Sequence, residues 1–478
     1  MTRQPRPEPT TPAQRWAFFA VISLGLFLIS LDNSILYTAL PELNAQLDTT
    51  PTQALWILNA YPLVLCGLLL GTGALGDKIG HRLMFLTGLA IFGAASLAAA
   101  FAPTAWVLVI ARGLLGLGAA TMMPATLALI RLTFADEQER NTAIGIWSSV
   151  AVIGAAVGPL IGGALLEVFW WGSVFLINVP IVVAAIVLTV WLAPENLPNP
   201  HKHFDILSSI YALIALSGLT VAIKEAANPE RTPGLLSAAI VAVLVGAVLF
   251  TRRQNTLADP LLTFDIFRSR LFTGGVIAAA GSMFVLIGAE LQTVQKLQLV
   301  DALSPLQAGF AVVAMAAGAF PASVLGGANL HRVGFLPLIA GGFAGCAAGV
   351  VMLVWGSQLQ SLPVEVAALA LVGLSAGAVM SVSSIAILGA APMHRSGMAA
   401  GVEEVSYEFG TLLTVAITGS LLARWRLVSP VLDHDGAYTF AYHRVLIVLA
   451  IIAALLALCT WWCFRDNPKS GDVAQEAR

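Results

Sequence analysis

The chain has 478 residues and a net charge of −2, and 58% of its residues are hydrophobic while only 10% are charged. Soluble domains carry about 25% charged residues, so this composition excludes a water-soluble fold. Apolar stretches long enough to cross about 30 Å of hydrocarbon as helices recur along the chain. They lack the two-residue alternation of barrel strands. The sequence therefore predicts an all-α membrane protein.

Fourteen membrane-spanning helices are predicted from these stretches. We expect them near residues 16–40, 54–75, 83–101, 105–130, 141–166, 171–192, 205–224, 232–251, 270–296, 306–327, 335–356, 364–390, 396–423 and 439–464. Residues 1–15 are polar and rich in Pro, Thr and Arg, which is typical of a disordered tail. Residues 465–478 form a second predicted tail.

The distribution of positive charge predicts the orientation. With both termini in the cytoplasm, 17 Lys and Arg residues fall on the cytoplasmic side and five on the other, while Arg112 and Arg444 lie within helices. Cytoplasmic loops of membrane proteins carry an excess of Lys and Arg, and an odd number of helices would scramble this pattern. The charges therefore favour fourteen spans with both termini inside.

A weak internal repeat divides the chain. The loop that begins at Gly73 and the loop that begins at Gly327 share a glycine, a basic residue five positions on, and a second glycine two positions further. The copies lie 254 residues apart, which is about eight helices. Internal repeats are typical of secondary transporters. We expect a six-helix bundle over 16–192, two inserted helices with their linkers over 193–269, and a second six-helix bundle over 270–464.

The first helix contains a carboxylate, Asp32, about 23 Å from its cytoplasmic end at 1.5 Å per residue. A charge within the hydrocarbon costs about 2.5–3.5 kcal/mol on insertion scales, so such residues are usually functional. Arg112, about 10 Å below the outer end of the fourth helix, lies at a similar depth. Protonation of Asp32 could break a pair with Arg112 and so couple protons to conformation. We also expect Asp32 to contact a cationic substrate directly. A permanent structural ion pair is the alternative.

The helix predicted over 396–423 contains Glu403, Glu404 and Glu408 within six residues. Glu404 and Glu408 are four residues apart and share a helix face, whereas Glu403 points about 100° away. Two close carboxylates in a low dielectric cannot both ionise easily. They could therefore hold a proton or exchange it for a cation.

Other candidates for a cation site lie on several helices. Glu290 is about 30 Å into the ninth helix and could line an outward vestibule; an interfacial carboxylate that reaches to water is the alternative. Aromatic rings could stack on a cation, although packing or an interfacial belt explains them equally well. The aromatic candidates are Tyr37, Trp56, Tyr61 and Trp147.

The loop after the second helix resembles the signature of the major facilitator superfamily. Its pattern G-x-L-x-D-x-x-G-x-R/K matches Gly73, Leu75, Asp77, Gly80 and Arg82. This resemblance implies two six-helix bundles and a cytoplasmic latch that uses Asp77 and Arg82 to close the inner gate.

Further motifs resemble the fourteen-helix drug:proton antiporters, and most of all the quaternary-ammonium exporters of the QacA and SmvA type. They are Leu31–Ser34, the helix with Arg112 and Gly116, the antiporter motif Gly154–Gly163 with Gly158 and Pro159, the run Trp171–Pro180, and Glu403–Gly410 with Tyr407. The glycines around Pro159 imply close helix contacts and a kink with a mechanical role. One departure is Leu115, where the family often has Gln.

The predicted function is proton-coupled efflux of lipophilic cations such as quaternary ammonium antiseptics, biguanides and cationic dyes. We expect a monomer in the inner membrane, in contact with the lipid bilayer, driven by the proton gradient without a cofactor, metal or nucleic acid. Another cargo, such as a metabolite, peptide or lipid, and a membrane receptor remain as alternatives. The sequence has no Walker loop G-x-x-x-x-G-K-[ST], which argues against an ATP-driven pump.

Overall fold

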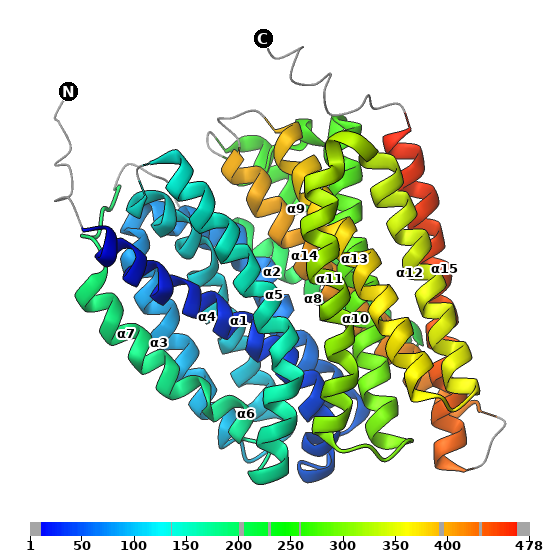
Figure 1. The fold of residues 1–478 in the computed structure, drawn as a ribbon. Helices are drawn as coiled ribbons and strands as arrows, with labels where there is room; N and C mark the ends of the chain where they lie inside the picture. The colour runs from blue at the N-terminus through cyan, green and yellow to red at the C-terminus, as the bar shows by residue number, and fades with distance from the viewer. Residues whose placement is uncertain are drawn as a thin grey trace, which may run out of the picture.

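The computed structural model describes residues 11–134, 136–199, 205–227, 231–257, 260–391, 396–429 and 433–465. Figure 1 shows that this part of the chain is a bundle of helices with both termini at the same end. The predicted tails lie mostly outside the described residues, as does most of the segment just before α8.

The helices follow the chain in three groups. The first group contains α1 (Pro12–Gln46), α2 (Pro51–Ile79), α3 (His81–Ala100), α4 (Ala105–Thr133), α5 (Glu137–Val168), α6 (Ser173–Leu176) and α7 (Asn178–Leu192). The second contains α8 (Ile206–Ala227) and α9 (Pro233–Thr256). The third begins with a 3₁₀ turn, η1 (Phe264–Arg268), and continues with α10 (Arg270–Leu299), α11 (Pro305–Val333), α12 (Phe335–Gln358), α13 (Leu362–Ala390), α14 (Ser396–Leu427) and α15 (His434–Phe464).

The expected number of spans is consistent with the structure. Within the described residues, thirteen helical stretches are long and apolar enough to cross a membrane, with α6 and α7 counted as one. Helix α5 adds a shorter apolar stretch, Ile153–Val168. Together they account for the fourteen predicted helices of a multi-pass membrane protein.

The structure differs from the predicted helices at one interruption and at several ends, of which α1 is an example. The helix expected over 171–192 is interrupted at Ile177, between α6 and α7. Pro180 lacks the N–H that would bond to the carbonyl of Leu176 four residues earlier, which removes one helical hydrogen bond across this interruption. Helix α1 does not end at residue 40 but continues through Pro41 to Gln46, and the buried Leu43 packs this extension into the core.

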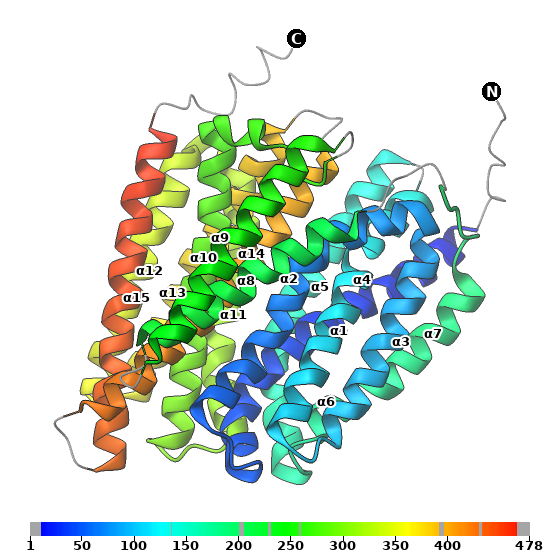
Figure 2. The ribbon, with the colours of Figure 1, turned by 180° about the vertical axis from the view of Figure 1, so that it is seen from behind.

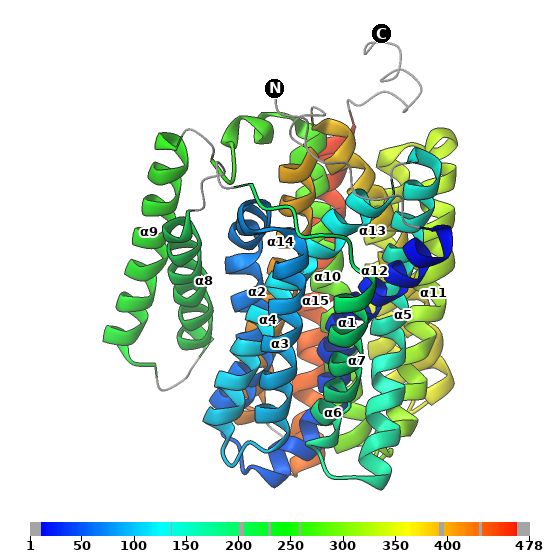
Figure 3. The same cartoon turned by 90° about the vertical axis from the view of Figure 1, so that its left-hand side faces the viewer.

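Helix packing groups α1–α7 into one half and α10–α15 into another. The pair α8 and α9 packs on the seam between them: α8 contacts α2 of the first half and α14 of the second, whereas α9 packs chiefly on α8 (Figures 2 and 3). The inserted helices therefore lie at the outside of the bundle.

The two halves meet mainly through α5 with α11 and α2 with α14, and also through α1 with α10. Several close contacts across this seam lie near the end of the bundle opposite the chain termini. Gln298 of α10 donates to the Thr38 carbonyl of α1 at 3.1 Å, and Ser304 donates to Glu167 at 2.9 Å. These contacts close that end of the seam.

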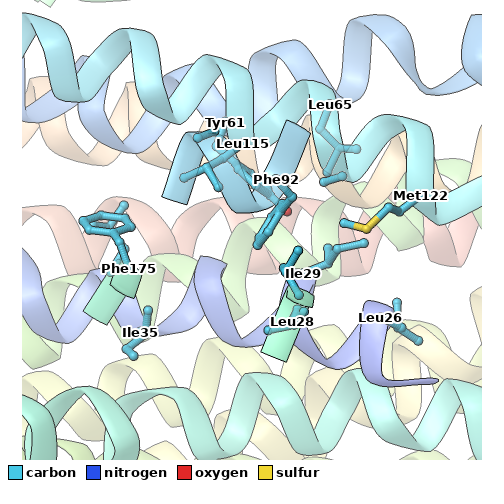
Figure 4. Packing of buried hydrophobic residues seen from close by; sticks show 14 of the residues in the cluster. Leu26, Leu28, Ile29, Ile35, Tyr61, Leu65, Phe92, Leu115, Met122 and Phe175 are labelled. Atoms are coloured by element: carbon cyan, nitrogen blue, oxygen red, sulfur yellow. The ribbon is translucent and has the colours of Figure 1, made fainter. Parts of the chain in front are cut away.

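Figure 4 shows the apolar core of the first half, built from α1, α2, α3, α4 and α6. Leu115 lies fully buried in this cluster. The residue that departs from the family pattern is thus an ordinary core residue here.

Candidate functional site

The two charged residues expected to pair in the first half are in contact. Arg112 of α4 donates from Nη1 to Oδ2 of Asp32 on α1 at 2.6 Å, and both side chains are fully buried. Arg112 also donates from Nε to the Ile57 carbonyl of α2 at 3.2 Å. Its guanidinium lies over the ring of Tyr61, 4.6 Å from the centroid. One arginine therefore ties three helices together.

Asn178 is a further partner of this pair that the sequence analysis quoted only as part of a motif. At the first residue of α7, it donates from Nδ2 to the second oxygen of Asp32 at 2.9 Å and to Oγ of Ser96 at 3.2 Å. The side chain is fully buried. The break between α6 and α7 brings this amide beside the carboxylate. The sequence carried no signal for this contact, because one uninterrupted helix was expected here.

Because both oxygens of Asp32 accept hydrogen bonds and the residue is fully buried, it is sealed inside the first half. A drug could not reach this carboxylate in the present conformation. The geometry therefore favours the expected coupling role of Asp32 over the direct substrate contact that was also expected.

The second acidic group lies on α14. Tyr407 donates to Oε1 of Glu403 at 3.3 Å and to the Met380 carbonyl of α13 at 3.2 Å. Glu404 keeps partial exposure, whereas Glu408 is only 9% exposed. One oxygen of Glu408, Oε2, is buried with no hydrogen-bond partner in the described part of the chain. Glu403 is thus engaged locally, while Glu404 and Glu408 keep capacity for another ligand.

Side chains of α1 and α2 lie close enough to Glu408 for its charge to act on them. Tyr37 lies within electrostatic range of both Glu408 and Glu290, and Tyr61 lies within range of Glu408 and Asp32. Both tyrosine hydroxyls are buried and unpaired among the described residues. The structure therefore brings these residues from both halves into one polar region, which we call the central site: Tyr37, Tyr61, Glu290, Glu404 and Glu408.

Glu290 differs from its expected environment. It is only 6% exposed, and α10 continues nine residues beyond it to Leu299. Its carboxylate therefore does not line an open vestibule in this conformation. It also does not reach water at the interface, because it lies too far inside the bundle.

Two aromatic candidates lie away from the central site. Trp56 lines a small cavity between α2, α8 and α14, together with Asn59 and Lys224. Trp147 of α5 belongs to the core of the first half, and its Nε1 is buried with no partner in the described part of the chain.

The signature loop comprises the end of α2, Gly80 and the start of α3 in the structure, and it is bonded to the last turn of α7 and to the chain that follows. Arg82 donates to the carbonyls of Val190 at 3.0 Å and Pro194 at 3.3 Å, and Asp77 contacts His81 at 3.1 Å. Gly80 has φ +98°, a backbone conformation that favours glycine. This end of the motif is held within the first half and next to the linker toward the inserted helices. The latch that the resemblance implies stays a prediction.

The glycines of the α5 motif allow close approach on two faces. A Cβ added at Gly158 would collide with Ser34 of α1, and one added at Gly163 would lie 2.6 Å from the Leu306 nitrogen of α11. The carbonyl of Pro159 would be 2.6 Å from a Cβ added at Gly309 of α11. Helix α5 therefore packs without a gap against both halves of the molecule. Gly73 lies on α2, where an added Cβ would only touch Pro124 at 3.7 Å.

A buried ion pair in the second half was not predicted. Lys296 of α10 bonds to Glu365 of α13 at 2.7 Å, and both side chains are almost fully buried. The predicted helix ended at residue 296, so Lys296 was counted as an outer-loop charge. Glu365 was missed because it lies at the edge of its predicted helix, where a carboxylate is unremarkable.

Comparisons with known proteins identify relatives of this chain. A family model described as Major Facilitator Superfamily matches residues 22–297 and 267–478. The chain is 38% identical over 417 residues to the methyl viologen resistance protein SmvA of Salmonella typhimurium, covering 86% of this chain and 83% of that protein. It is 39% identical over 419 residues to the multidrug efflux pump LfrA of Mycolicibacterium smegmatis, covering 86% and 81%.

Solved structures share the fold. A bacterial homologue of the human lysosomal transporter Spinster, in an inward-facing and unoccupied conformation, has a TM-score of 0.68 over 95% of this chain and 98% of that chain, at 15% identity. An autoinhibited peptide transporter of the POT family has a TM-score of 0.67 at 17% identity, covering 96% and 98%. At this identity the likeness concerns the arrangement of helices alone.

Proposed function

The chain belongs to the major facilitator superfamily, and we propose that it exports lipophilic organic cations in exchange for protons. Members of this family are transporters rather than enzymes. The relatives SmvA and LfrA are named for methyl viologen resistance and multidrug efflux, which supports drug efflux here. The finer assignment to cations and protons depends on the side chains of the central site.

The observation that carries the proposal is the acidic character of the central site. Glu404, Glu408 and Glu290 lie on two helices of the second half. The charge of Glu408 acts on Tyr37 and Tyr61 of the first half, and the charge of Glu290 acts on Tyr37. The nearest buried cation, Arg112, is already bonded to Asp32. Carboxylates in a low dielectric are costly unless protonated or paired with a cation. Protons and a cationic drug would therefore compete for the same oxygens.

Asp32 supplies the coupling in this proposal. Its two oxygens join α1 to α4 and α7 through Arg112 and Asn178. A proton on Asp32 would remove the negative partner of a fully buried arginine and weaken these contacts. The ring of Tyr61 contacts the guanidinium of Arg112, and the charge of Glu408 acts on its hydroxyl. Tyr61 therefore connects the Asp32–Arg112 pair to the central site.

The proposed transport cycle is a rocking of the two halves about the central site. With the termini in the cytoplasm, as the 17-to-5 charge asymmetry favours, the closed end of the seam faces outward. The residues proposed to act in gating lie on the α5 seam and on the signature loop: Gly158, Pro159, Gly73, Asp77, Gly80 and Arg82. The inserted pair α8 and α9 is outside this path. We place the protein in the inner membrane as a monomer.

Export of another cargo is the main alternative. A metabolite, peptide or lipid exporter could use the same acids for protons alone. The acids favour a cationic cargo because Glu408 keeps an unpaired buried oxygen beside tyrosine rings, which suit a lipophilic cation.

The test is efflux from vesicles that contain the purified protein, with methyl viologen as a dication and tetraphenylphosphonium as a monocation. Efflux should require an imposed proton gradient and should stop when that gradient is collapsed while ATP is present. Glu408→Gln should impair export of the dication more than of the monocation, since a second positive charge would be left unpaired in a low dielectric. Glu42→Gln is the matched control, because this glutamate accepts a hydrogen bond from Gln46 near the exposed end of α1, away from the central site.

Two results would contradict the proposal. Efflux that persists without a proton gradient would exclude proton coupling. If Glu404→Gln and Glu408→Gln expressed normally and exported both cations as the parent does, the acids would have no role in binding cations, and another cargo would be favoured.

A further inference from the structure

The buried pair of Lys296 and Glu365 repeats a contact of the first half with its charges reversed. In the first half, the acid of the pair is on α1 and the base on α4; in the second, the base is on α10 and the acid on α13. These helices are the first and fourth of their halves. A buried ion pair is costly to form, and the removal of one partner costs even more stability. Two such pairs on equivalent helices therefore suggest that the second pair also has a physical role.

The two pairs lie at different depths. Asp32 is fourteen residues before the end of α1 at Gln46, about 21 Å at 1.5 Å per residue. Lys296 is three residues before the end of α10 at Leu299, about 5 Å. The second pair is therefore not part of the central site. It lies at the end of the bundle where the seam is closed.

Lys296 binds a second carboxylate there. Its Nζ contacts Oδ2 of Asp301 at 2.7 Å, in addition to Glu365 at 2.7 Å. Asp301 belongs to the connection between α10 and α11, residues 300–304, which we call the gate loop. The carbonyl of Lys296 also accepts hydrogen bonds from the backbone of Val300 and Asp301. One residue thus fixes both the course of the gate loop and its attachment to α13.

The gate loop delivers the contacts that close the seam. It ends at Ser304, which caps α11 and donates to Glu167 of α5 at 2.9 Å. The next turn places the Leu306 backbone against Gly163 of α5. Figure 1 shows this connection at the lower end of the bundle, beside α1 and α5. Any change in the position of the loop relative to α13 would therefore act on the seam between the halves.

We propose that Lys296 is a gate-positioning residue: with Asp301 and Glu365 it holds the gate loop against α5 and thereby stabilises the conformation closed at this end. We call the two ion pairs of Lys296, with Asp301 and with Glu365, the clamp. Loss of the clamp shifts the protein toward the conformation open at this end. This inference rests on the alternating access of the proposed function, but it concerns the equilibrium between conformations and not the cargo.

The experiment measures cross-linking across the seam without drug or proton gradient. Glu167→Cys and Ser304→Cys are introduced together into the parent and into every variant, so the loss of their hydrogen bond is common to all, while the contact of Leu306 with Gly163 remains. A short bifunctional thiol reagent is added to the full chain in vesicles. Mass spectrometry of the joined peptides gives the cross-linking rate. The chain has four native cysteines, so their reaction with the reagent is measured in the chain without the two added cysteines and subtracted. Because no transport is measured, failure of the proposed cargo would leave this result interpretable.

Three variants then separate gating from folding. Asp301→Asn releases the loop and leaves the Lys296–Glu365 pair intact, and its side chain is 34% exposed, so folding is not threatened. Lys296→Met breaks the whole clamp. The double variant Lys296→Met with Glu365→Leu removes both buried charges, which stability tolerates far better than the loss of one partner. Arg253→Met is the control, since it breaks an ion pair of equal length, 2.7 Å, between α9 and Asp205, the residue just before α8.

We expect Asp301→Asn and the double variant to shift the gate equilibrium about tenfold toward the open conformation, which corresponds to about 1.4 kcal/mol. The cross-linking rate should fall in proportion to the population of closed molecules. The control should cross-link as the parent does. If Lys296→Met fails to fold, the other two variants decide. Rates equal to the parent in both Asp301→Asn and the double variant would overturn the proposal and reduce the pair to packing within the second half.

Discussion

Replacement of Asp32 separates the stability of the buried ion pair from its role in transport. Asp32→Asn keeps the shape of the side chain but leaves the guanidinium of Arg112, which is fully buried, without a negative partner. Removal of one member of a buried pair costs about 3–5 kcal/mol. The double variant Asp32→Leu with Arg112→Met removes both charges, and such replacements are often neutral or stabilising by about 1–4 kcal/mol. The single variant should therefore be much less stable than the double variant.

The assay combines thermal unfolding in detergent with proton-driven efflux in vesicles. We expect the melting temperature to fall clearly in Asp32→Asn and to return toward the parent value in the double variant. Efflux of every substrate should be lost in both, because neither has a carboxylate that can take up the coupling proton. A double variant that still exports drug against its gradient would refute the coupling role. An unchanged melting temperature in Asp32→Asn would refute the energetic argument.

Three further predictions follow from individual contacts. Gly163→Ala should impair transport through overpacking at the seam, worth about 1–3 kcal/mol, whereas Gly341→Ala, which has open space at its Cβ, should not; equal effects on efflux would contradict this. Asn178→Ala removes a hydrogen bond to a charged group, worth about 1.5–3 kcal/mol, and should lower the melting temperature by more than Ser96→Ala does. A hydrogen bond from Arg253 of α9 lowers the pKa of Asp205, just before α8. The stability that this carboxylate adds should therefore be constant above about pH 4 and be lost as the pH falls further. A difference in melting temperature between the parent and Asp205→Asn that varied between pH 5 and 8 would be inconsistent with this.

The fold was largely predictable because the lipid bilayer restricts the secondary structure that can span it. Long apolar stretches in a membrane must become helices, and the positive charges then favour an even number of spans. The sequence could not give the ends of helices that run beyond the apolar stretch. Helix α1 continues past Pro41, since a proline removes one hydrogen bond but does not stop a helix that is packed on its neighbours. The same limitation hid the Lys296–Glu365 pair, because both residues lie at predicted helix ends.

The charged contact of the candidate site was predictable because charges are rare in apolar helices. The positions of uncharged side chains were not predictable, because they depend on how the helices pack. The contact between Asp32 and Arg112 followed from two charges at similar depth in apolar helices. The place of Asn178 did not, because an amide in a motif carries no signal of its partner. Trp56 shows the opposite error: an aromatic residue on the right helix lies near its end, in a cavity beside α8, and not in the central site. Which face and which turn an aromatic ring occupies depends on helix packing that one sequence does not reveal.

The two halves share an arrangement of helices but differ in where their charges lie. In the first half, the buried pair is sealed between α1, α4 and α7 at the level of the central site. In the second, the acids on α14 remain available to a ligand, and the ion pair has moved to the closed end of the seam. Under the proposed function, proton exchange, drug binding and gating are therefore assigned to different residues. One residue could not perform all three. A carboxylate that senses protons must exchange them, one that binds drug must be exposed to it, and a clamp that sets the gate must stay paired. Protonation at Asp32 can then change the energy of the first half without first breaking the gate, and the drug can be released without loss of the clamp at Lys296.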